Sequence, residues 1–205
     1  MIIGCISAYN EEQLLPGCLA SLEGQVDRIV VADGRYKNFP GEGACSTDKT
    51  VAIARAFGAE VILPPNDEPW IDEPTKRSAY LVGKEGNWYL RIDADERLVG
   101  DLPDTATLNI NNVYALRIVW PNNLLNSWVP CIFAHHGKMY YDKVHCALFS
   151  DGKLAHTRAT NLVKLESPCL VHLKDYRPVE RVRARQVYYS WLREAERWHR
   201  SAWEI

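Results

Sequence analysis

The stretch Trp88-Tyr89-Leu90-Arg91-Ile92-Asp93-Ala94-Asp95 decides the fold prediction, because it joins an apolar, aromatic run to two carboxylates. Alternate residues of a strand project to the same side, so we expect Asp93 and Asp95 to point the same way. Hard oxygen ligands of this kind suit Mg²⁺ or Mn²⁺, which then bridge to a phosphate. An Asp-x-Asp tripeptide is common by chance, and its place at the end of a strand gives it weight.

Strands and helices alternate along the first hundred residues. Uninterrupted apolar runs predict strands, which we expect at residues 2–8, 28–33, 60–63 and 88–92. Apolar positions three and four apart predict helices, which we expect at residues 14–22, between a Ser46-Thr47-Asp48 cap and Gly58, and at about 75–84 before Gly86. This alternation predicts right-handed crossovers, and therefore an α/β fold with a mixed, mostly parallel sheet and helices on both faces.

The second half of the chain is less regular. Residues 113–119 and 139–149 are expected to be strands of a hairpin-like addition, separated by a loop rich in proline, asparagine and tryptophan at 120–130. From Pro178 onward, apolar residues recur at spacings of three and four, which predicts an amphipathic C-terminal helix. The length suits one domain over residues 1–205.

Composition narrows the class of protein. The 24 basic and 26 acidic side chains give a formal net charge of −2, which argues against a protein that coats nucleic acid or an anionic membrane. No apolar run is long enough to span a bilayer and no basic segment precedes the first apolar residues, so we expect neither a transmembrane segment nor a signal peptide. Six scattered cysteines predict reduced thiols in a cytoplasmic protein. Glycine-rich phosphate loops and a serine-hydrolase elbow are absent from the sequence.

Acidic and polar residues follow three of the predicted strands. Tyr9-Asn10-Glu11-Glu12 follows the first, Asp33 the second, and Asp93 with Asp95 the fourth. Parallel sheets bind ligands beyond the carboxyl ends of their strands. Like charges crowded at one edge are costly unless a cation or hydrogen-bond donors face them. The sequence therefore predicts a ligand site at this edge, with helix caps on a solvated rim as the alternative.

With these motifs the sequence resembles the family 2 glycosyltransferases of the GT-A fold. The matching segments are Ser7-Ala8-Tyr9-Asn10-Glu11-Glu12, Val31-Ala32-Asp33-Gly34, Ser46-Thr47-Asp48-Lys49-Thr50 and the stretch from Asn87 to Glu96. The resemblance extends more thinly through residues 136–142, 148–149 and 170–176, which look like the subgroup that includes lipopolysaccharide-core heptose glucosyltransferases. It implies a nucleotide-sugar-binding half over residues 1–100, and an acceptor half with the C-terminal helix over residues 101–205.

The resemblance implies roles for single residues. Tyr9 would pack against the nucleotide base, and Asp33 would accept a hydrogen bond from a uracil-type N–H. Asp95 would bind Mn²⁺ or Mg²⁺, and His172 would complete the metal or phosphate site unless it is a core histidine at a strand end. Arg77 would reach the base or phosphates and Asp93 the ribose, so the implied nucleotide-binding residues are Ala8, Tyr9, Asn10, Glu12, Asp33, Arg77, Asp93 and Ala94.

An inverting transfer needs a general base that deprotonates the acceptor hydroxyl. In the family this base is often an aspartate in an acidic pair downstream of the metal motif, and this chain has no Glu-Asp pair there. Asp142 occupies the matching segment and is the candidate base, with His136 and Asp151 as runners-up. Alternatively Asp142 only solvates a strand edge, which would favour a retaining reaction or an inactive relative.

Three further features stand out. Residues 35–45 separate two motifs that are adjacent in the family, and we expect them to form a flap over the nucleotide or acceptor, or else a surface insertion. Cysteines and histidines at 131–136 and 145–146 match no common zinc spacing. The stretch from Val171 is rich in arginine and aromatic residues, which is typical of a solvated basic face, or of a contact with headgroups, a phosphorylated glycan or nucleic acid.

Together these features predict a metal-dependent glycosyltransferase that moves a sugar from a nucleoside diphosphate, UDP rather than GDP, to an acceptor hydroxyl. A glycan, a protein side chain or a hydroxymethylated DNA base all remain compatible as acceptors, and a homo-oligomer is compatible with the chain. One alternative is a non-catalytic relative that binds a nucleotide or glycan. Another is a sugar-phosphate nucleotidyltransferase, which would want a glycine- and arginine-rich loop after the first strand.

Overall fold

The computed structural model describes residues 1–121, 123–142, 147–155 and 161–200. Its strands are β1 (Ile2–Ala8), β2 (Arg28–Asp33), β3 (Glu60–Ile62), β4 (Trp88–Asp93), β5 (Glu96–Val99), β6 (Val113–Trp120), β7 (Asn123–Ala134), β8 (Met139–Asp142), β9 (Ala147–Ser150), β10 (Lys153–Leu154) and β11 (Leu162–His172). The α-helices are α1 (Leu15–Leu22), α2 (Thr50–Ala56), α3 (Glu73–Ala79) and α4 (Val179–Arg200). Short 3-10 helices are η1 (Pro65–Asp67), η2 (Thr105–Thr107) and η3 (Lys174–Tyr176).

The main sheet has the strand order β3-β2-β1-β4-β7-β6-β11-β5. Within it β1 pairs in parallel with both β2 and β4, and β2 pairs in parallel with β3. The register places Ala8 opposite Asp33 and Ser7 opposite Asp93, so the carboxyl ends of three strands lie at one edge. The predicted α/β class with a mixed sheet is therefore confirmed, and its parallel part positions the motifs of the first half.

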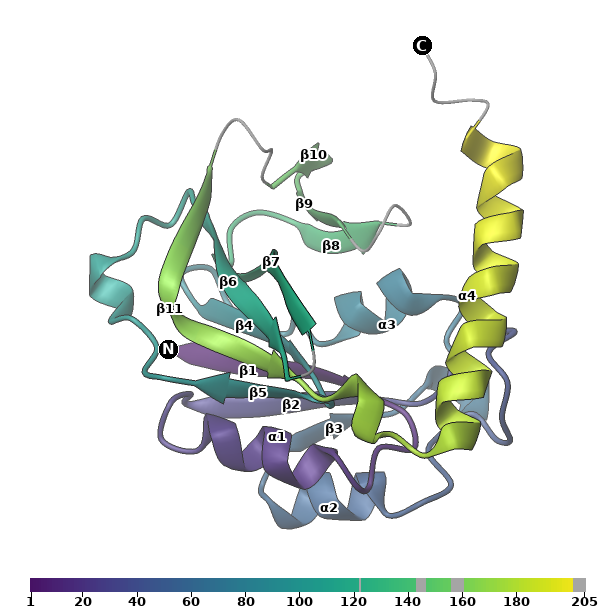
Figure 1. Cartoon of the computed structure of the whole chain (residues 1–205). Coiled ribbons are helices and arrows are strands. Elements are labelled where there is room, and N and C mark those ends of the chain that lie inside the picture. The colour runs from purple at the N-terminus through teal and green to yellow at the C-terminus, as the bar shows by residue number, and fades with distance from the viewer. Residues whose placement is uncertain (122, 143–146, 156–160, 201–205) are drawn as a thin grey trace.

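Helices cover both faces of this sheet. Figure 1 shows α1 and α2 below it, α3 and the small β10-β9-β8 sheet above it, and α4 standing beside the edge where β1, β2 and β4 end. The periodic leucines predicted for the first helix face the core, where Leu15, Leu19 and Leu22 of α1 are fully buried. The predicted C-terminal amphipathic helix is confirmed as α4, which buries Tyr188.

The third predicted helix is shorter than expected. It spans Glu73–Ala79 instead of about 75–84. It begins earlier than expected because Asp72 is its N-cap and accepts a hydrogen bond from the backbone N–H of Thr75 at 2.8 Å. After Tyr80 the chain leaves the helix, and the N–H of Gly83 donates to the Tyr89 hydroxyl at 2.6 Å. The Ser46-Thr47-Asp48 cap was predicted one residue too early. α2 begins at Thr50, and its N-cap is Lys49, which makes no side-chain hydrogen bond; Oδ1 of Asp48 accepts one from the Thr50 N–H at 2.9 Å.

The second half departs most from the prediction. The prediction of a loop at residues 120–130 is wrong. Most of this segment belongs to β7, which pairs antiparallel with β4 and β6. Pro130 fits there at a register shift, where the ladder does not need its missing N–H. The single strand expected at 139–149 is two strands, β8 and β9, of a separate sheet. The sequence analysis did not predict β5 or β11, which pair with each other antiparallel.

The five cysteines that the structure describes are free thiols, and Cys146 lies outside the described residues. Within the described part of the chain, no helix combines the length and apolar character that crossing a membrane requires.

Gly34 ends β2 in a conformation that only glycine adopts easily. Its φ is +109°, and an added Cβ would lie 2.5 Å from Cγ of Pro64 and 2.8 Å from the carbonyl oxygen of Ala44. We expect Gly34→Ala to lower the free energy of unfolding by more than about 1 kcal/mol, measured by urea denaturation. Gly58→Ala is the control, because Gly58 also has a positive φ but nothing within 4 Å of the added atom. Equal losses in the two variants would contradict a steric cause at Gly34.

Candidate functional site

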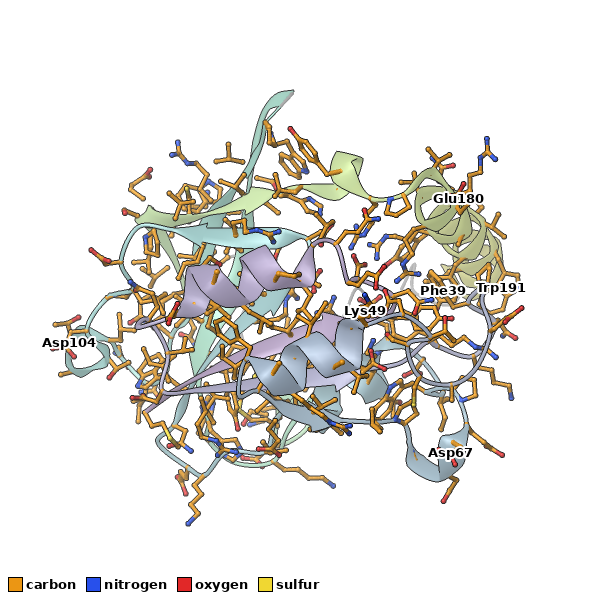
Figure 2. The ribbon with its side chains drawn as sticks, turned by 90° about the horizontal axis from the view of Figure 1, so that it is seen from below. Phe39, Lys49, Asp67, Asp104, Glu180 and Trp191 are labelled. Atoms are coloured by element: carbon orange, nitrogen blue, oxygen red, sulfur yellow. The ribbon has the colours of Figure 1, made fainter. Side chains whose placement is uncertain are left out.

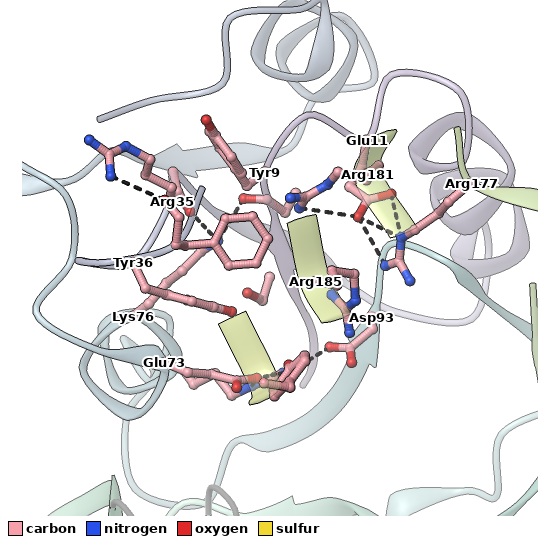
Figure 3. Close-up of a pocket in the computed structure, with 16 residues that line it drawn as sticks. Tyr9, Glu11, Arg35, Tyr36, Glu73, Lys76, Asp93, Arg177, Arg181 and Arg185 are labelled. Carbon is pink, nitrogen blue, oxygen red and sulfur yellow. Dashed lines mark hydrogen bonds and ion pairs between the residues drawn. The ribbon is translucent and has the colours of Figure 1, made fainter. Parts of the chain in front are cut away.

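A small cavity lies where β1 and β4 end. Its volume is about 60 Å³, and it is enclosed by α3, the segment after β2 and α4 (Figure 3). The lining is highly charged, with the basic side chains Arg35, Lys76, Arg77, Arg177, Arg181 and Arg185 facing the acidic side chains Glu11, Glu73 and Asp93. Four of the predicted nucleotide-binding residues line this cavity, namely Ala8, Tyr9, Arg77 and Asp93.

Asp95 and His172, the two predicted metal ligands, lie together beside this cavity. Oδ2 of Asp95 is 2.8 Å from Nε2 of His172, and Asp95 is 1% exposed. Trp120 Nε1 donates to Nδ1 of His172 at 2.9 Å, so the imidazole proton sits on Nε2 and points at Asp95. Burial alone would raise the pKa of Asp95, but the hydrogen bond from His172 and the charge of Arg177 hold that pKa below its usual value.

Arg177 joins two buried carboxylates from distant parts of the chain. Its guanidinium donates to Oδ2 of Asp95, and its Nε donates to Oε1 of Glu11 at 3.0 Å. Glu11 follows β1 and is 4% exposed, whereas Arg177 lies just before α4. These ion pairs fix the beginning of α4 against the sheet edge. Sequence reasoning missed this residue, although the four-residue spacing of Arg177, Arg181 and Arg185 is a signal that they share one side of a helix.

Arg77 makes a second bridge of the same kind. Its Nη2 lies 2.9 Å from Oδ1 of Asp93 and 2.8 Å from Oε1 of Glu73. Burial would raise the pKa of Asp93, but the charges of Arg77 and Arg91 bring that pKa well below its usual range. Asp93 is therefore an anion in the folded protein at neutral pH. The structure thus brings together Arg77 and Asp93, which were predicted from different segments.

Residues 35–45 cover Tyr9. The Tyr9 ring meets the Phe39 ring edge-on with centroids 5.9 Å apart, and the Tyr9 hydroxyl donates to the carbonyl oxygen of Glu42 at 2.9 Å. Phe39 in turn packs on Tyr188 of α4, with ring centroids 5.2 Å apart. Figure 2 shows Phe39 beside α4, on the side of the molecule where Glu180 and Trp191 lie. Residues 35–45 therefore pack between Tyr9 and α4, and a flap over a nucleotide or acceptor stays a prediction.

Four of the eight predicted nucleotide-binding residues do not line this cavity. Asp33 is fully buried, and its carboxylate accepts hydrogen bonds from the N–H and hydroxyl of Ser46. Ala94 is buried in the core. Asn10 and Glu12 line a second cavity of about 310 Å³, between the loop after β1 and the beginning of α4. Because Ser46 lies 13 positions after Asp33, its hydrogen bonds with the Asp33 carboxylate hold the segment before α2 in place.

The three candidate bases lie on or near the small sheet. Asp142 is exposed at the end of β8, and Nδ1 of His136 is 3.1 Å from the carbonyl oxygen of Ala134. Asp151 accepts a hydrogen bond from the N–H of Lys138 at 2.7 Å, which is a turn contact. The Tyr141 N–H donates to Ser78 Oγ at 2.9 Å, so β8 is held against α3. None of the three candidates lines the two cavities described above.

The site fits a divalent cation only in part. Among the described residues, no group of three or more His, Cys, Asp or Glu is placed to hold a metal ion. Asp95 and His172 offer one carboxylate and one imidazole, which Mn²⁺ accepts, and Mg²⁺ is commonly held by one or two carboxylates together with substrate phosphates. The donor set therefore suits a cation that binds with a phosphate ligand. Of the cysteine and histidine group, Cys131 is buried in β7, and residues 145–146 lie outside the described part.

Lys76 is a buried lysine in the same wall. Its Nζ donates to the carbonyl oxygens of Ala8 and Gly34, both at 2.6 Å. Burial lowers the pKa of Lys76 to about 7, although the nearby Asp33 charge opposes this. These contacts tie the end of β1 to the end of β2, and sequence reasoning missed them because they depend on tertiary packing.

The depressed pKa of Lys76 predicts a pH-dependent stability. An unfolded lysine has a pKa of about 10.4, so between about pH 7 and pH 10 the unfolded chain binds a proton that the folded chain does not. The contribution of Lys76 to the free energy of unfolding therefore rises with pH in this window. We expect the stability difference between wild type and Lys76→Met to shift in favour of wild type from pH 7 to pH 9, measured by urea denaturation. A difference that does not change with pH would contradict this assignment.

The chain is similar in sequence to several known proteins. No protein-family model matches the chain. An uncharacterized glycosyltransferase of Rickettsia bellii is 30% identical over 142 residues, which cover 65% of this chain and 44% of that protein. A second one, from Rickettsia felis, is 34% identical over 103 residues, covering 48% of this chain and 31% of that protein. A TPR repeat-containing protein of Synechococcus elongatus is 34% identical over 96 residues, covering 46% and 20%.

Solved structures give weaker likenesses. TarS residues 1–349 of S. aureus aligns with 60% of this chain and 36% of its own, at 19% identity and a TM-score of 0.43. Glucosyl-3-phosphoglycerate synthase from Mycobacterium tuberculosis, in complex with Mn²⁺, UDP and glucosyl-3-phosphoglycerate, aligns with 60% of this chain and 44% of its own, at 20% identity and a TM-score of 0.42. The chain spans less than half the length of the curated relatives it matches, and among them it is similar to the rickettsial glycosyltransferases.

Proposed function

We propose that the chain is a glycosyltransferase that takes its sugar from a nucleoside diphosphate, and that the donor is a UDP-sugar. One observation carries the proposal: Tyr9 after β1, Arg77 on α3, and Asp93 and Asp95 at the end of β4 meet at one edge of a parallel sheet. Ligands of such sheets bind at this edge. The similarity to proteins named as glycosyltransferases, at 30% and 34% identity, supports the same conclusion.

In this proposal different residues of the chain contact the base, the ribose and the phosphates of the donor. Tyr9 faces the base, Asp93 accepts a hydrogen bond from the ribose, and Arg77 contacts the phosphates while Asp93 and Glu73 hold its guanidinium in place. Asp95 and His172 would hold Mn²⁺ or Mg²⁺, which supplies a Lewis acid for the leaving diphosphate. Because Arg177 donates to the same oxygen of Asp95, a cation there has to share or replace that contact.

The acceptor side of the proposal rests on fewer contacts. Asp142 is the proposed general base for the acceptor hydroxyl, with inversion at the anomeric carbon, and β8 brings it next to α3. We propose a glycan or another hydroxyl-bearing acceptor, in the manner of the heptose glucosyltransferase subgroup, and a cytoplasmic location. We propose that the acceptor is bound by the second half of the chain itself, or by a partner or a second copy in a homo-oligomer.

The proposal is tested by adding UDP-glucose, UDP-N-acetylglucosamine and GDP-mannose to the purified chain, with and without Mn²⁺. We expect a UDP-sugar to raise the melting temperature and to release UDP slowly by donor hydrolysis. A ligand at 100 times its Kd stabilises a protein by about 2.7 kcal/mol, which a thermal shift detects. A shift without UDP release would favour the non-catalytic binding relative. No shift with any nucleotide sugar would contradict the proposal.

A further inference from the structure

We propose that Arg181 and Arg185 of α4 bind the diphosphate group of the donor, an inference that rests on the proposed function. Both side chains come from the C-terminal helix and line the cavity at the ends of β1 and β4 (Figure 3). They reach it because residues four apart lie on one side of a helix. Arg177, four residues before Arg181, fixes the beginning of that helix through Glu11 and Asp95.

The guanidinium of Arg181 has hydrogen-bonding capacity that the protein does not use. Its Nε is buried and has no hydrogen-bond partner among the described residues, and its closest carboxylate oxygen, on Glu11, is 3.6 Å away. The group lies instead over aromatic rings, 4.9 Å from the centroid of Tyr9 and 4.8 Å from that of Phe39. A buried donor without a partner is costly, so this position favours a ligand that brings acceptor oxygens.

Arg185 is similarly placed one helical turn further along. The structure records its guanidinium 5.4 Å from the centroid of the Tyr189 ring. Among the side chains that the structure describes, no carboxylate lies within ion-pair distance of Arg185. Figure 3 shows Arg185 on the Asp93 side of the cavity and Arg181 on the Glu11 side. The two guanidinium groups therefore flank the space between the ends of β1 and β4.

Three other arginines line the cavity, and all three have partners within the protein. Arg35 donates to the carbonyl oxygens of Gly43 and Phe39. Arg77 lies between Asp93 and Glu73, and Arg177 lies between Asp95 and Glu11, so each has two carboxylate partners. Arg181 has only the long contact with Glu11 at 3.6 Å, and no ion pair is found for Arg185 among the described residues, so these two have the most charge to offer a ligand beside Arg77. A diphosphate matches them because its oxygens accept paired hydrogen bonds from planar guanidinium groups.

Binding of the complete donor requires movement of Arg181. The cavity of about 60 Å³ is smaller than the several hundred Å³ of common ligand sites. The guanidinium lies over the Tyr9 ring, which is the proposed platform for the base. We therefore expect Arg181 to exchange its ring contact for the phosphate oxygens when a nucleotide binds.

The experiment is isothermal titration calorimetry of the full chain with inorganic pyrophosphate, UDP and uridine, in the presence of EDTA. We expect Arg181→Met and Arg185→Met each to weaken the binding of pyrophosphate and UDP about tenfold, and the double variant about a hundredfold. Arg181→Lys and Arg185→Lys keep the charge but lose the planar fork, so they should lose less. Arg183→Met is the matched control, because Arg183 is exposed on the same helix, and it should bind like wild type.

The outcomes separate this inference from the proposed function. If Arg181→Met and Arg185→Met bind pyrophosphate and UDP as wild type does, the inference is wrong, and UDP binding by wild type still supports a nucleotide-sugar enzyme. If wild type binds no pyrophosphate, the inference is also wrong. If pyrophosphate binding depends on both arginines but no UDP-sugar is bound or cleaved, the diphosphate site stands and the proposed function fails. The lysine variants decide the result if a methionine variant does not fold.

Discussion

Replacing Asp95 by asparagine is expected to slow UDP release from a UDP-sugar by about 10²–10³-fold and to destabilise the fold at the same time. Asp95 is 1% exposed and bound by His172 and Arg177, so the neutral amide leaves a buried guanidinium with only Glu11 as its anionic partner. Breaking a buried ion pair by removing one partner costs about 3–5 kcal/mol. Loss of a group that stabilises the leaving diphosphate costs about 10²–10³-fold in rate.

Both effects of Asp95→Asn can be measured on one preparation. UDP release is followed with saturating donor, and the free energy of unfolding is obtained from urea denaturation by two probes. Asp67→Asn is the control, because Asp67 is an exposed aspartate in η1 that lines neither cavity. An Asp95→Asn variant that keeps wild-type turnover would remove Asp95 from the proposed site. Wild-type stability in the variant would show that its ion pair with Arg177 is not formed.

Replacing Arg177 by methionine is expected to release α4 from the sheet. The guanidinium of Arg177 lies between Glu11 and Asp95, and its loss leaves two buried carboxylates without their main partner. We expect a decrease of about 3–5 kcal/mol in the free energy with which α4 docks. Trypsin should then cut after the arginines of α4 faster than in wild type, while the amides of β1, β2 and β4 keep their protection from hydrogen exchange.

Arg183→Met controls for the loss of one positive charge in this part of the chain. Arg177 precedes Pro178 and is not itself a trypsin site, so Arg177→Met leaves every cleavage site of α4 in place. The Arg183 side chain is exposed, so proteolysis at the remaining arginines should follow wild type. If α4 of the Arg177→Met variant stays as protected as in wild type, the two carboxylates do not hold the helix. If the whole chain loses protection together, α4 and the sheet unfold as one unit and the anchor is not local.

The parallel core could be predicted because its signals are local. The apolar runs of β1, β2 and β4 and the leucine spacing of α1 lie within single segments, and these elements are found where they were expected. The position of Asp93 and Asp95 at the end of β4 followed from the same run. In β7 the local signals pointed the other way, because Pro130 and several asparagines disfavour a strand, and only pairing with β4 and β6 makes one.

The charge pairs of the site could not be predicted, because they join residues far apart in the sequence. Arg177 binds two carboxylates, those of Glu11 and Asp95, which lie 166 and 82 positions away from it in the sequence. The sequence did not indicate that the N–H and hydroxyl of Ser46 both donate to the Asp33 carboxylate, and the role of Asp33 in binding a base stays a prediction. The pairing of Asp95 with His172 was implied by the family resemblance alone, and the structure places the two side chains in contact.

The most direct test of the account is a crystal structure of the full chain soaked with UDP and Mn²⁺. We predict that the uracil lies on the Tyr9 ring, that the diphosphate lies between Asp95 and the guanidinium groups of Arg181 and Arg185, and that Arg181 leaves its contact with Tyr9. UDP bound away from the ends of β1 and β4, with Asp95 still enclosed by Arg177 and His172, would contradict the account.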